Sequence, residues 1–496
     1  MEFVLASRPL LAVLVSLLAA ILIVVCGRWP NLREGWTLLA AVTKFGLVFS
    51  LLGDVLGGRT PGVTLFEVSP GIALALRVDA LGISFALSAS LLWILTSVYS
   101  IGYMRSLGEE HQTRYFASFA ICLSSTIGIA FAANLLTFLI FYEMLTIATY
   151  PLVVHKGTAE ALASGRKYLV YLLTGGGALL LAVAWVRHIA PTLDFQPGGI
   201  LPNATGATEL ALLLILFVIA VGVKAGLMPL HSWLPAAMIA PTPVSALLHA
   251  VAVVKAGVFG FARVTGFVFG ADMLQRSGVI NPVAALAAVT ILLASLLAMA
   301  QDNLKRRLAY STIGHLSYII LGIVLVTPDA WRGGLFHIVT HAAMKITLFF
   351  CAGAIYAKTH RENISELDGI GKQMPVTLGA FGVASLGLAG VPPMGGFLSK
   401  WFLAGGTLAA EQPALLAVLI ISGLLNAAYL FPIVYRAFFR RSDQFTKFAE
   451  ASPLMVVPLC LTALLSVGLG IFPDAFFHWF SLANETAMSV LQDAVK

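Results

Sequence analysis

Long apolar runs, separated by short polar segments, recur from one end of the chain to the other. Most of them have the length of about 20 residues that an α-helix needs to cross a hydrocarbon layer of about 30 Å. No polar segment between them is long enough to form a soluble domain. The pattern predicts an all-α polytopic membrane protein with about fourteen transmembrane helices. Their expected ranges are 9–26, 36–56, 81–103, 115–133, 135–155, 168–187, 208–230, 241–268, 283–301, 309–326, 332–357, 375–410, 413–436 and 453–472.

Two of these expected helices contain residues that interrupt a helix. Pro229 follows Gly226 in the seventh, and Pro392 and Pro393 lie between glycines in the twelfth. Proline removes a helical hydrogen bond, so each helix should break, which a membrane tolerates only where protein or a wet cavity satisfies the backbone. Broken helices in corresponding halves of a carrier mark its transport site. We therefore expect an N-terminal three-helix segment at 1–110, one repeat at 111–270, a second repeat at 280–437, and a C-terminal helix and tail at 438–496.

Positive charge indicates how the chain is oriented, because Lys and Arg accumulate in short cytoplasmic loops. With the N-terminus outside, the cytoplasmic loops hold Arg28, Arg33, Arg105, Arg114, Lys156, Arg166, Lys167, Lys305, Arg306, Arg307, Lys358, Arg361, Lys372, Arg436, Arg440, Arg441 and Lys447. The opposite loops and tails hold only Arg8, Arg59, Arg77, Arg187, Arg276, Arg332 and Lys496. This asymmetry predicts that both termini face the outside of the plasma (inner) membrane.

Composition agrees with a membrane protein and argues against nucleic-acid binding and against a cofactor held by cysteines. The chain is 59% hydrophobic and 11% charged, whereas soluble domains are about 45–50% apolar and about 25% charged. The net charge of +7 is explained by the cytoplasmic flanks, so no nucleic-acid partner is expected. The four cysteines are widely spaced and form no CxxC pair, so they are interpreted as packing residues and no cofactor is expected.

Four of the charged residues within or beside the apolar runs suggest a functional site, because a charge there costs about 2.5–3.5 kcal/mol on insertion scales. They are Glu143, Lys224, Lys255 and Lys400. One interpretation is structural: Glu143 and Lys224 would form a buried ion pair, and the Lys400 side chain would reach the interface. The other is functional, because burial lowers the pKa of a lysine while a nearby carboxylate raises it, which lets a lysine load and release protons near neutral pH.

Histidines supply further groups that could exchange protons, since the unperturbed pKa of histidine is about 6.5. His337, His341 and Lys345 are spaced four residues apart, which places them on one stripe of the eleventh helix. His249 and His315 lie inside the eighth and tenth helices and could equally be hydrogen-bonded packing residues. No third ligand is evident beside His337 and His341, so no metal site is expected.

Two further motifs have structural interpretations. His231 and Trp233 fall near a helix end, where they could anchor the chain at the interface or admit protons. Gly175, Gly176 and Gly177 lie in an apolar run, so they indicate close helix packing and not a nucleotide-binding loop.

Several blocks together resemble the antiporter-like subunits shared by respiratory complex I, membrane-bound hydrogenases and Mrp-type Na⁺/H⁺ antiporters. The resemblance covers nearly the whole chain. The blocks are Phe141-Tyr142-Glu143, the segments 224–235, 240–249, 254–257 and 302–312, the run His337 to Lys345, and Gly395 to Lys400.

The resemblance implies fourteen helices in two inverted five-helix repeats and a charged axis in the membrane plane. It implies a coupling pair at Glu143 and Lys224, a central relay at Lys255 and a terminal lysine at Lys400. Its members work with other membrane subunits and move protons, in some cases with Na⁺. Lys400 favours the D subunit of an Mrp-type antiporter or the smaller quinone-reductase and hydrogenase relatives, whereas the block 240–249 is more similar to the large complex I subunit. Both parent complexes therefore remain open, and this chain shows no redox or hydrolytic site of its own.

Overall fold

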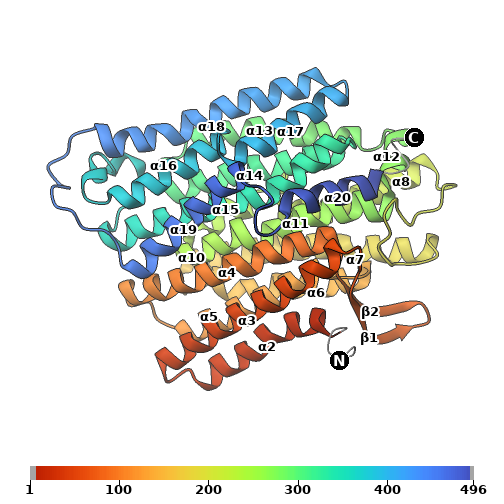
Figure 1. The fold of residues 1–496 in the computed structure, drawn as a ribbon, viewed down its shortest axis with the longest axis horizontal. Helices are drawn as coiled ribbons and strands as arrows, with labels where there is room; N and C mark the ends of the chain where they lie inside the picture. Colours follow the sequence, from red (N-terminus) through yellow and green to blue (C-terminus); the bar gives the residue numbers. More distant parts are fainter. Residues whose placement is uncertain (1–6, 492–496) are drawn as a thin grey trace.

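The structure is a computed structural model that describes residues 7–491. Almost all of its elements are helices, drawn in Figure 1. They are α2 (Arg8–Val25), α3 (Pro30–Leu56), α4 (Ala80–Leu107), α5 (Gln112–Ala130), α6 (Leu135–Val153), α7 (Ala159–Ile189), α8 (Ala207–Ala225), α9 (Trp233–Ala236), η1 (Ala237–Ile239), α10 (Thr242–Ala246), η2 (Leu247–Val251), α11 (Val253–Arg263), η3 (Val264–Phe269), α12 (Ala271–Ser277), α13 (Asn281–Met299), α14 (Leu304–Val324), α15 (Pro328–Thr359), η4 (Ile364–Glu366), η5 (Ile370–Lys372), α16 (Pro375–Ala389), α17 (Gly395–Ala409), α18 (Pro413–Phe439), α19 (Pro453–Ile471) and α20 (Trp479–Leu491).

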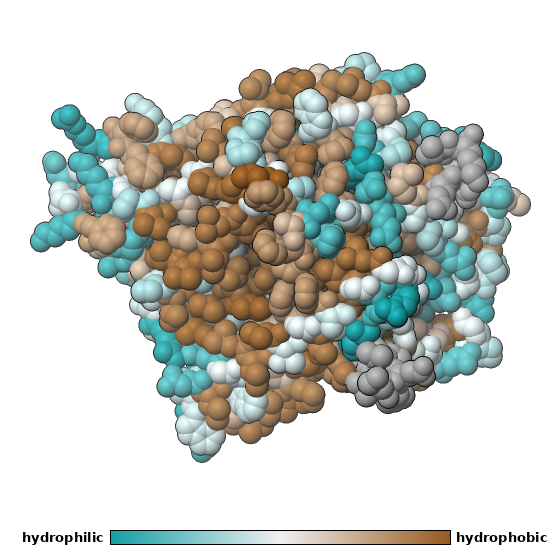
Figure 2. Space-filling view, viewed as in Figure 1, coloured by the Kyte–Doolittle hydropathy of each residue, from teal (hydrophilic) through white to brown (hydrophobic). Residues whose placement is uncertain are grey.

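Twelve helices in residues 7–491 are long and apolar enough to cross a membrane. The long helices run roughly side by side along the longest axis of the molecule (Figure 1). Figure 2 shows an apolar belt across the middle of one face, with hydrophilic residues gathered toward both ends of the helices. A belt of this kind matches the hydrocarbon layer, because apolar side chains are stable in lipid and charged ones are not. The protein is therefore a polytopic all-α membrane protein, as the apolar pattern predicts.

Two expected transmembrane helices are not among these twelve. One is α5, and the other is the pair α16 and α17, which the structure separates at 390–394. A similar separation divides α8 from α9 at 226–232. Both preceding helices end at a glycine in the left-handed region, Gly226 with φ +67° and Gly390 with φ +91°. The backbone is therefore interrupted at both proline-containing segments.

Helix starts follow local chemistry. Three helices, α16, α18 and α19, begin at a proline: Pro375, Pro413 and Pro453. The first N–H groups of a helix have no helical acceptor, so a proline at this position costs no hydrogen bond. At the start of α6, the Asn134 side chain accepts a hydrogen bond from the Thr137 backbone N–H at 2.9 Å. This cap fixes where the helix that carries Glu143 begins.

The apolar pattern did not predict a β-hairpin. Strands β1 (Gly62–Ser69) and β2 (Ile72–Arg77) pair antiparallel, with Gly62 opposite Arg77 and Ser69 opposite Ile72. The Asn134 side chain donates to the Ala73 carbonyl at 2.8 Å, which ties the hairpin to the start of α6. In Figure 1 the hairpin and α12 lie at one end of the helices, opposite the segment that joins α18 to α19.

Helix α20 was also not predicted as a separate element. It has 13 residues, which is too short to span a membrane, and it packs against α15 and α4. The Trp479 indole donates to the Ser84 carbonyl at 3.2 Å, and Arg332 Nη2 donates to Asn484 Oδ1 at 2.6 Å. These contacts hold α20 beside the helix that carries His337 and His341.

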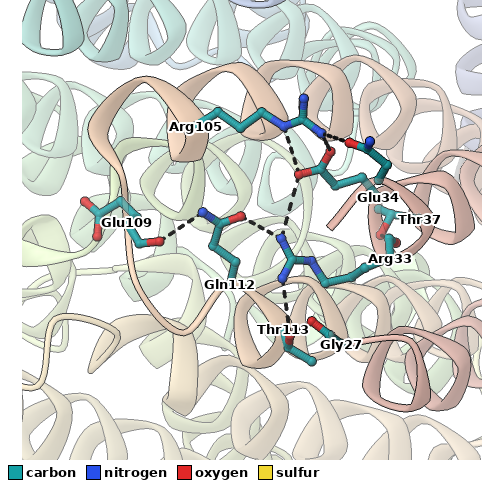
Figure 3. A network of polar contacts seen from close by, with 9 residues as sticks. Gly27, Arg33, Glu34, Thr37, Arg105, Glu109, Gln112 and Thr113 are labelled. Carbon is teal, nitrogen blue, oxygen red and sulfur yellow. Dashed lines mark hydrogen bonds and ion pairs between the residues drawn. The ribbon is translucent and has the colours of Figure 1, made fainter. Parts of the chain in front are cut away.

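A polar network joins α3, α4 and the start of α5 (Figure 3). Arg105 donates to the Glu34 carboxylate, and Arg33 lies 3.7 Å from the same group. Arg33 also donates to Gln112 Oε1 at 2.7 Å and to Thr113 Oγ1 at 3.3 Å. Because the Glu34 side chain is only 5% exposed, one buried carboxylate stands between two guanidinium groups.

His155 follows α6 outside the membrane-spanning segments and predicts a pH effect on stability. Burial, followed by the positive charges of Arg114 and His111, lowers the pKa of His155 to about 4. An unfolded chain binds a proton near the ordinary pKa of about 6.5, so protonation favours unfolding between these values. We expect the melting temperature of the purified protein to fall as the pH is lowered from 7 to 5, and to fall less in His155→Asn. An equal loss in both proteins would show that His155 is not responsible.

Candidate functional site

Glu143 lies in the middle of α6 and is partly buried. Its carboxylate faces Gly176 of α7, where an added Cβ would come within 2.5 Å of Glu143 Oε1. The same oxygen has no hydrogen-bond partner among the described residues. The glycine run in α7 therefore leaves room for a carboxylate inside the membrane, in addition to allowing close helix packing.

Lys224 lies in the last turn of α8 and is 1% exposed. Its ammonium donates to the Tyr142 carbonyl and lies 3.4 Å from the centroid of the Tyr142 ring. Tyr142 precedes Glu143, and its hydroxyl donates to the Ala220 carbonyl of α8 at 3.0 Å. Lys224 and Glu143 are electrostatic neighbours, but no nitrogen–oxygen distance between them is 4.0 Å or less in residues 7–491. The lysine is held on the backbone beside the glutamate and does not form a closed ion pair with it.

The interruption after α8 is held by side chains. The Trp233 indole donates back to the Val223 carbonyl at 2.8 Å, and Ser232 Oγ donates to Tyr171 Oη at 2.8 Å. Trp233 is fully buried, so it is not an interfacial anchor in the isolated chain, whereas His231 is only partly buried. The tryptophan thus secures the broken segment directly after Lys224.

The segment from α10 to η3 carries the central basic residues. His249 lies in the π-helical turn η2, is fully buried, and has no hydrogen-bond partner at either ring nitrogen among the described residues. Lys255 lies on α11, and its Nζ is 2.8 Å from His341 Nδ1. At Gly257 an added Cβ would lie 2.3 Å from the Ala225 backbone nitrogen. The helix bearing Lys255 therefore packs directly against the end of the helix bearing Lys224.

Three histidines from two helices form a cluster of rings. His315 of α14 lies with its ring centroid 5.3 Å from both His337 and His341 of α15. A hydrogen bond of 3.1 Å joins His315 Nδ1 and His337 Nε2, and a second of 2.7 Å joins His337 Nδ1 and Ser399 Oγ of α17. All three rings are 0–1% exposed. With Lys255, these contacts form a line from α11 to α17.

The two remaining lysines flank this line. Lys345, one turn beyond His341, is fully buried and donates to Ser311 Oγ at 2.6 Å. Lys400 follows Ser399, donates to the Leu388 carbonyl at 2.6 Å, and lies 5.1 Å from the Tyr318 ring centroid. Lys400 also lines an open, mostly apolar hollow between α16, α17 and α18. Its ammonium is held on the carbonyls at the end of α16.

The structure brings most of the predicted site residues together and adds several that the sequence did not indicate. Lys255, His341, His315 and His337 form a linked group, with Lys345 and Lys400 beside it. His249 contacts Phe349 of α15, with ring centroids 4.8 Å apart, and within residues 7–491 it has no ring contact with another histidine or tyrosine. The added residues are Tyr142, Tyr318, Ser311 and Ser399, to which the sequence assigned no role because hydroxyl-bearing residues are common in transmembrane helices.

Gly176→Ala tests the position of the Glu143 carboxylate. The added methyl would overlap the end of a flexible side chain, so the carboxylate should move while the helices stay assembled. Because a misplacement of about 1 Å can cost about 10²-fold in rate, the role that the resemblance implies for Glu143 predicts that proton transport falls by about tenfold or more. Gly177→Ala is the matched control, since nothing lies within 4 Å of that position. Equal transport in the two variants at equal abundance would contradict the prediction.

Comparison with known proteins gives consistent relatives. The family described as NADH:quinone oxidoreductase/Mrp antiporter, TM, matches residues 132–426. NADH-quinone oxidoreductase subunit N of Desulforudis audaxviator is 30% identical, over 82% of this chain and 83% of that protein. Hydrogenase-4 component B of Escherichia coli is 30% identical, over 86% of this chain and 68% of that protein. Na(+)/H(+) antiporter subunit A1 of Staphylococcus aureus is 29% identical over 93% of this chain, which spans 61% of the antiporter subunit.

Two solved structures share the fold. A chain of the Mrp complex from Dietzia sp. DQ12-45-1b has a TM-score of 0.86 at 19% identity, covering 98% of this chain and 97% of that one. A chain of the membrane-bound sulfane sulfur reductase, an archaeal respiratory membrane complex, has a TM-score of 0.86 at 23% identity, covering 98% and 99%. The family match and the relative at 30% identity show that the chain belongs to the family of antiporter-like membrane subunits of NADH:quinone oxidoreductases and Mrp antiporters.

Proposed function

We propose that this chain translocates protons as one subunit of a multisubunit membrane complex, of the D-subunit kind in an Mrp-type monovalent cation/proton antiporter. The observation that carries the proposal is the line from Lys255 through His341, His315 and His337 to Ser399, in which all the side chains are buried and titratable or hydroxyl-bearing. Proton transfer along side chains needs groups that both accept and donate, and imidazole does so near neutral pH. Apolar packing alone would not require such a line.

In this proposal Glu143 and Lys224 are the loading pair. Lys224 is fixed on the Tyr142 carbonyl without a closed ion pair, so its proton is not locked onto Glu143. A proton enters beside the broken segment 226–232, loads Lys224 against Glu143, and moves through Lys255 and the histidines to Lys400. A neighbouring subunit would bias the pair by changing the local charge. His249 and Lys345 are further proton-binding groups beside this route.

The proposed architecture follows from the two breaks. Helices α5 to η3 and α13 to α18 each contain one interrupted helix, at 226–232 and at 390–394. We propose that these segments are two inverted five-helix repeats at 111–270 and 280–437, within a total of fourteen membrane-spanning helices. The three helices at 1–110 and the C-terminal part at 438–496 lie outside the repeats. Both termini are placed outside the plasma membrane, because the Lys- and Arg-rich loops then face the cytoplasm.

A second parent complex has a specific observation in its favour. NADH-quinone oxidoreductase subunit N aligns over 83% of its own length, whereas the antiporter A1 subunit aligns over 61%. The alternative is therefore a proton-pumping membrane subunit of a complex I-type NADH-quinone oxidoreductase or of a membrane-bound hydrogenase. Electrons would then run through other subunits, and this chain would move the protons.

Cation exchange in everted vesicles that contain the full complex tests the proposal. We expect an imposed pH gradient to drive Na⁺ or K⁺ exchange in wild type and not in Glu143→Ala or Lys224→Ala at equal complex abundance. Normal exchange in both variants would overturn the loading pair. Proton movement that requires an electron donor would replace the antiporter with the redox-linked complex.

A further inference from the structure

Buried cations in this chain fall into two chemical classes. Six Lys or Arg side chains are buried among the described residues: Arg33, Lys44, Lys224, Lys255, Arg263 and Lys345. Both arginines have a carboxylate within 4 Å, Arg33 on Glu34 and Arg263 on Asp79. Within residues 7–491, no lysine has a carboxylate at that distance.

This division follows from the chemistry of the two side chains. A guanidinium keeps its proton in proteins and needs a counter-charge when it is buried, whereas an amine can lose its proton and remain buried as a neutral group. Three of the four buried lysines, Lys224, Lys255 and Lys345, are in or beside the proposed proton route. The fourth, Lys44, belongs to the same chemical class but lies in the N-terminal three-helix segment, which the proposed route does not enter.

Lys44 is in the middle of α3 and is 0% exposed. Its Nζ donates to Ser16 Oγ of α2 at 2.5 Å and lies 5.3 Å from the centroid of the Trp93 ring of α4. Ser124 of α5 donates to the Val13 carbonyl at 2.8 Å, one turn before Ser16. Among the described residues the amine therefore has one hydrogen-bond partner, the Ser16 hydroxyl of α2, and it also faces the Trp93 ring of α4.

On α4, two polar groups on the face that carries Trp93 have no hydrogen-bond partner among the described residues. Trp93 Nε1 and Ser97 Oγ are buried and unpaired among the described residues, and they lie one turn apart on the same face of α4. Buried polar groups that lack a protein partner are the groups that internal water satisfies. Because the Trp93 ring faces Lys44, the face of α4 beside the amine carries one unpaired donor and, a turn further on, one unpaired hydroxyl.

The other charged side chains of α3, with their ion-pair partners, lie toward the two ends of this helix. Glu34, with Arg33 and Arg105, is ten residues before Lys44, and Asp54, with Arg8 and Arg59, is ten residues after it. Each step is about 15 Å along the helix. Among the described residues of α2, α4 and α5, no acidic or basic side chain contacts Lys44. Lys44 therefore stands midway between two carboxylates, one toward each end of the helix.

We propose that Lys44 is a proton-binding site of the N-terminal segment that loads and releases a proton during turnover, apart from the line between Lys224 and Lys400. This inference rests on the proposed transport function, because a proton must move for the site to be loaded. In the alternative role, Lys44 stays protonated and only holds α2 against α3, and it would make the same hydrogen bond to Ser16. The two roles differ in whether the amine must lose its proton.

Three substitutions separate these roles in vesicles that contain the full complex. Lys44→Met removes the charge, Lys44→Arg makes it permanent, and Lys44→His keeps a titratable base of lower intrinsic pKa. We expect the Met and Arg variants to transport about tenfold more slowly than wild type, since a positioned proton-transfer group typically contributes about 10²-fold or more. We expect the His variant to keep transport with its pH profile displaced toward acid. Lys358→Met, at an exposed lysine, is the matched control.

Wild-type rates in Lys44→Arg or in Lys44→Met, at equal abundance, would overturn the inference while leaving the proposed function intact. If the Lys44 variants do not assemble, Ser16→Ala provides the second test. It removes the one hydroxyl that accepts from the amine, so the pH profile of transport should move toward acid, and an unchanged profile would overturn the inference. Wild-type vesicles that move no protons under either a pH gradient or an electron donor would overturn both proposals.

Discussion

Lys255→Met is expected to reduce proton transport by about 10²-fold or more, because in the proposed route Lys255 is a central group that both accepts and donates a proton. Lys255 Nζ is 2.8 Å from His341 Nδ1, and this contact is the link between α11 and the histidine cluster. Methionine has a similar length and no charge, so it fills the same space and should not disturb packing. The measurement is proton-coupled exchange in vesicles at equal complex abundance.

A matched variant keeps this prediction specific. Lys358→Met makes the same chemical change at an exposed residue near the end of α15 and should transport as wild type does. His341→Asn should resemble Lys255→Met, because it removes the imidazole at the other end of the link. Wild-type transport in an assembled Lys255→Met complex would show that protons bypass this lysine.

Much of the fold could be predicted because lipid imposes one dominant rule on the sequence. A helix that crosses the membrane needs an apolar run of about 20 residues, so the runs at 9–26 and 413–436 correspond to α2 and α18 with small differences at their ends. The breaks at Pro229 and Pro392 could also be expected, because proline acts on its own helix. The β-hairpin and α20 could not, since both are short and are held by contacts with distant residues, such as Asn134 to Ala73 and Trp479 to Ser84.

The candidate site likewise contains some residues that the sequence indicates and others that it does not. Glu143, Lys224 and Lys255 are visible in the sequence because a charge in an apolar run is costly. The partner of Lys224 is the Tyr142 carbonyl, and every residue has a carbonyl, so no sequence signal could identify it. Gly176 illustrates the same limit, because glycine in a membrane helix predicts close packing whether it faces a methyl group or a carboxylate.

Two kinds of buried polar contact have different consequences for motion. Arg263 with Asp79, and Arg33 with Glu34, are arginine–carboxylate contacts that keep both charges permanently satisfied. The lysines instead contact carbonyls, hydroxyls and imidazole, as Lys345 contacts Ser311. A fixed frame of arginine pairs around adaptable lysines would let protons move without loosening the helices, because only the lysine contacts need to change.

Glu34→Gln tests that frame and is expected to lower the free energy of unfolding by about 3 kcal/mol, because it leaves a buried guanidinium without its counter-charge. Glu34 is the carboxylate between Arg33 and Arg105 in Figure 3. Arg105 is half exposed and can turn to water, whereas Arg33 is 5% exposed and cannot. The loss should appear as a lower melting temperature of the purified complex and as faster proteolysis between α4 and α5.

Glu110→Gln is the control for this effect, because it removes an exposed carboxylate close to the same segment and should leave the melting temperature unchanged. Arg33→Met combined with Glu34→Gln should recover part of the lost stability, since an apolar side chain needs no counter-charge. A double variant less stable than Glu34→Gln alone would mean that Arg33 stabilises the segment mainly through Gln112 and Thr113. Transport per assembled complex should stay close to wild type in these variants, because the network holds helices together and lies away from the line between Lys255 and Lys400.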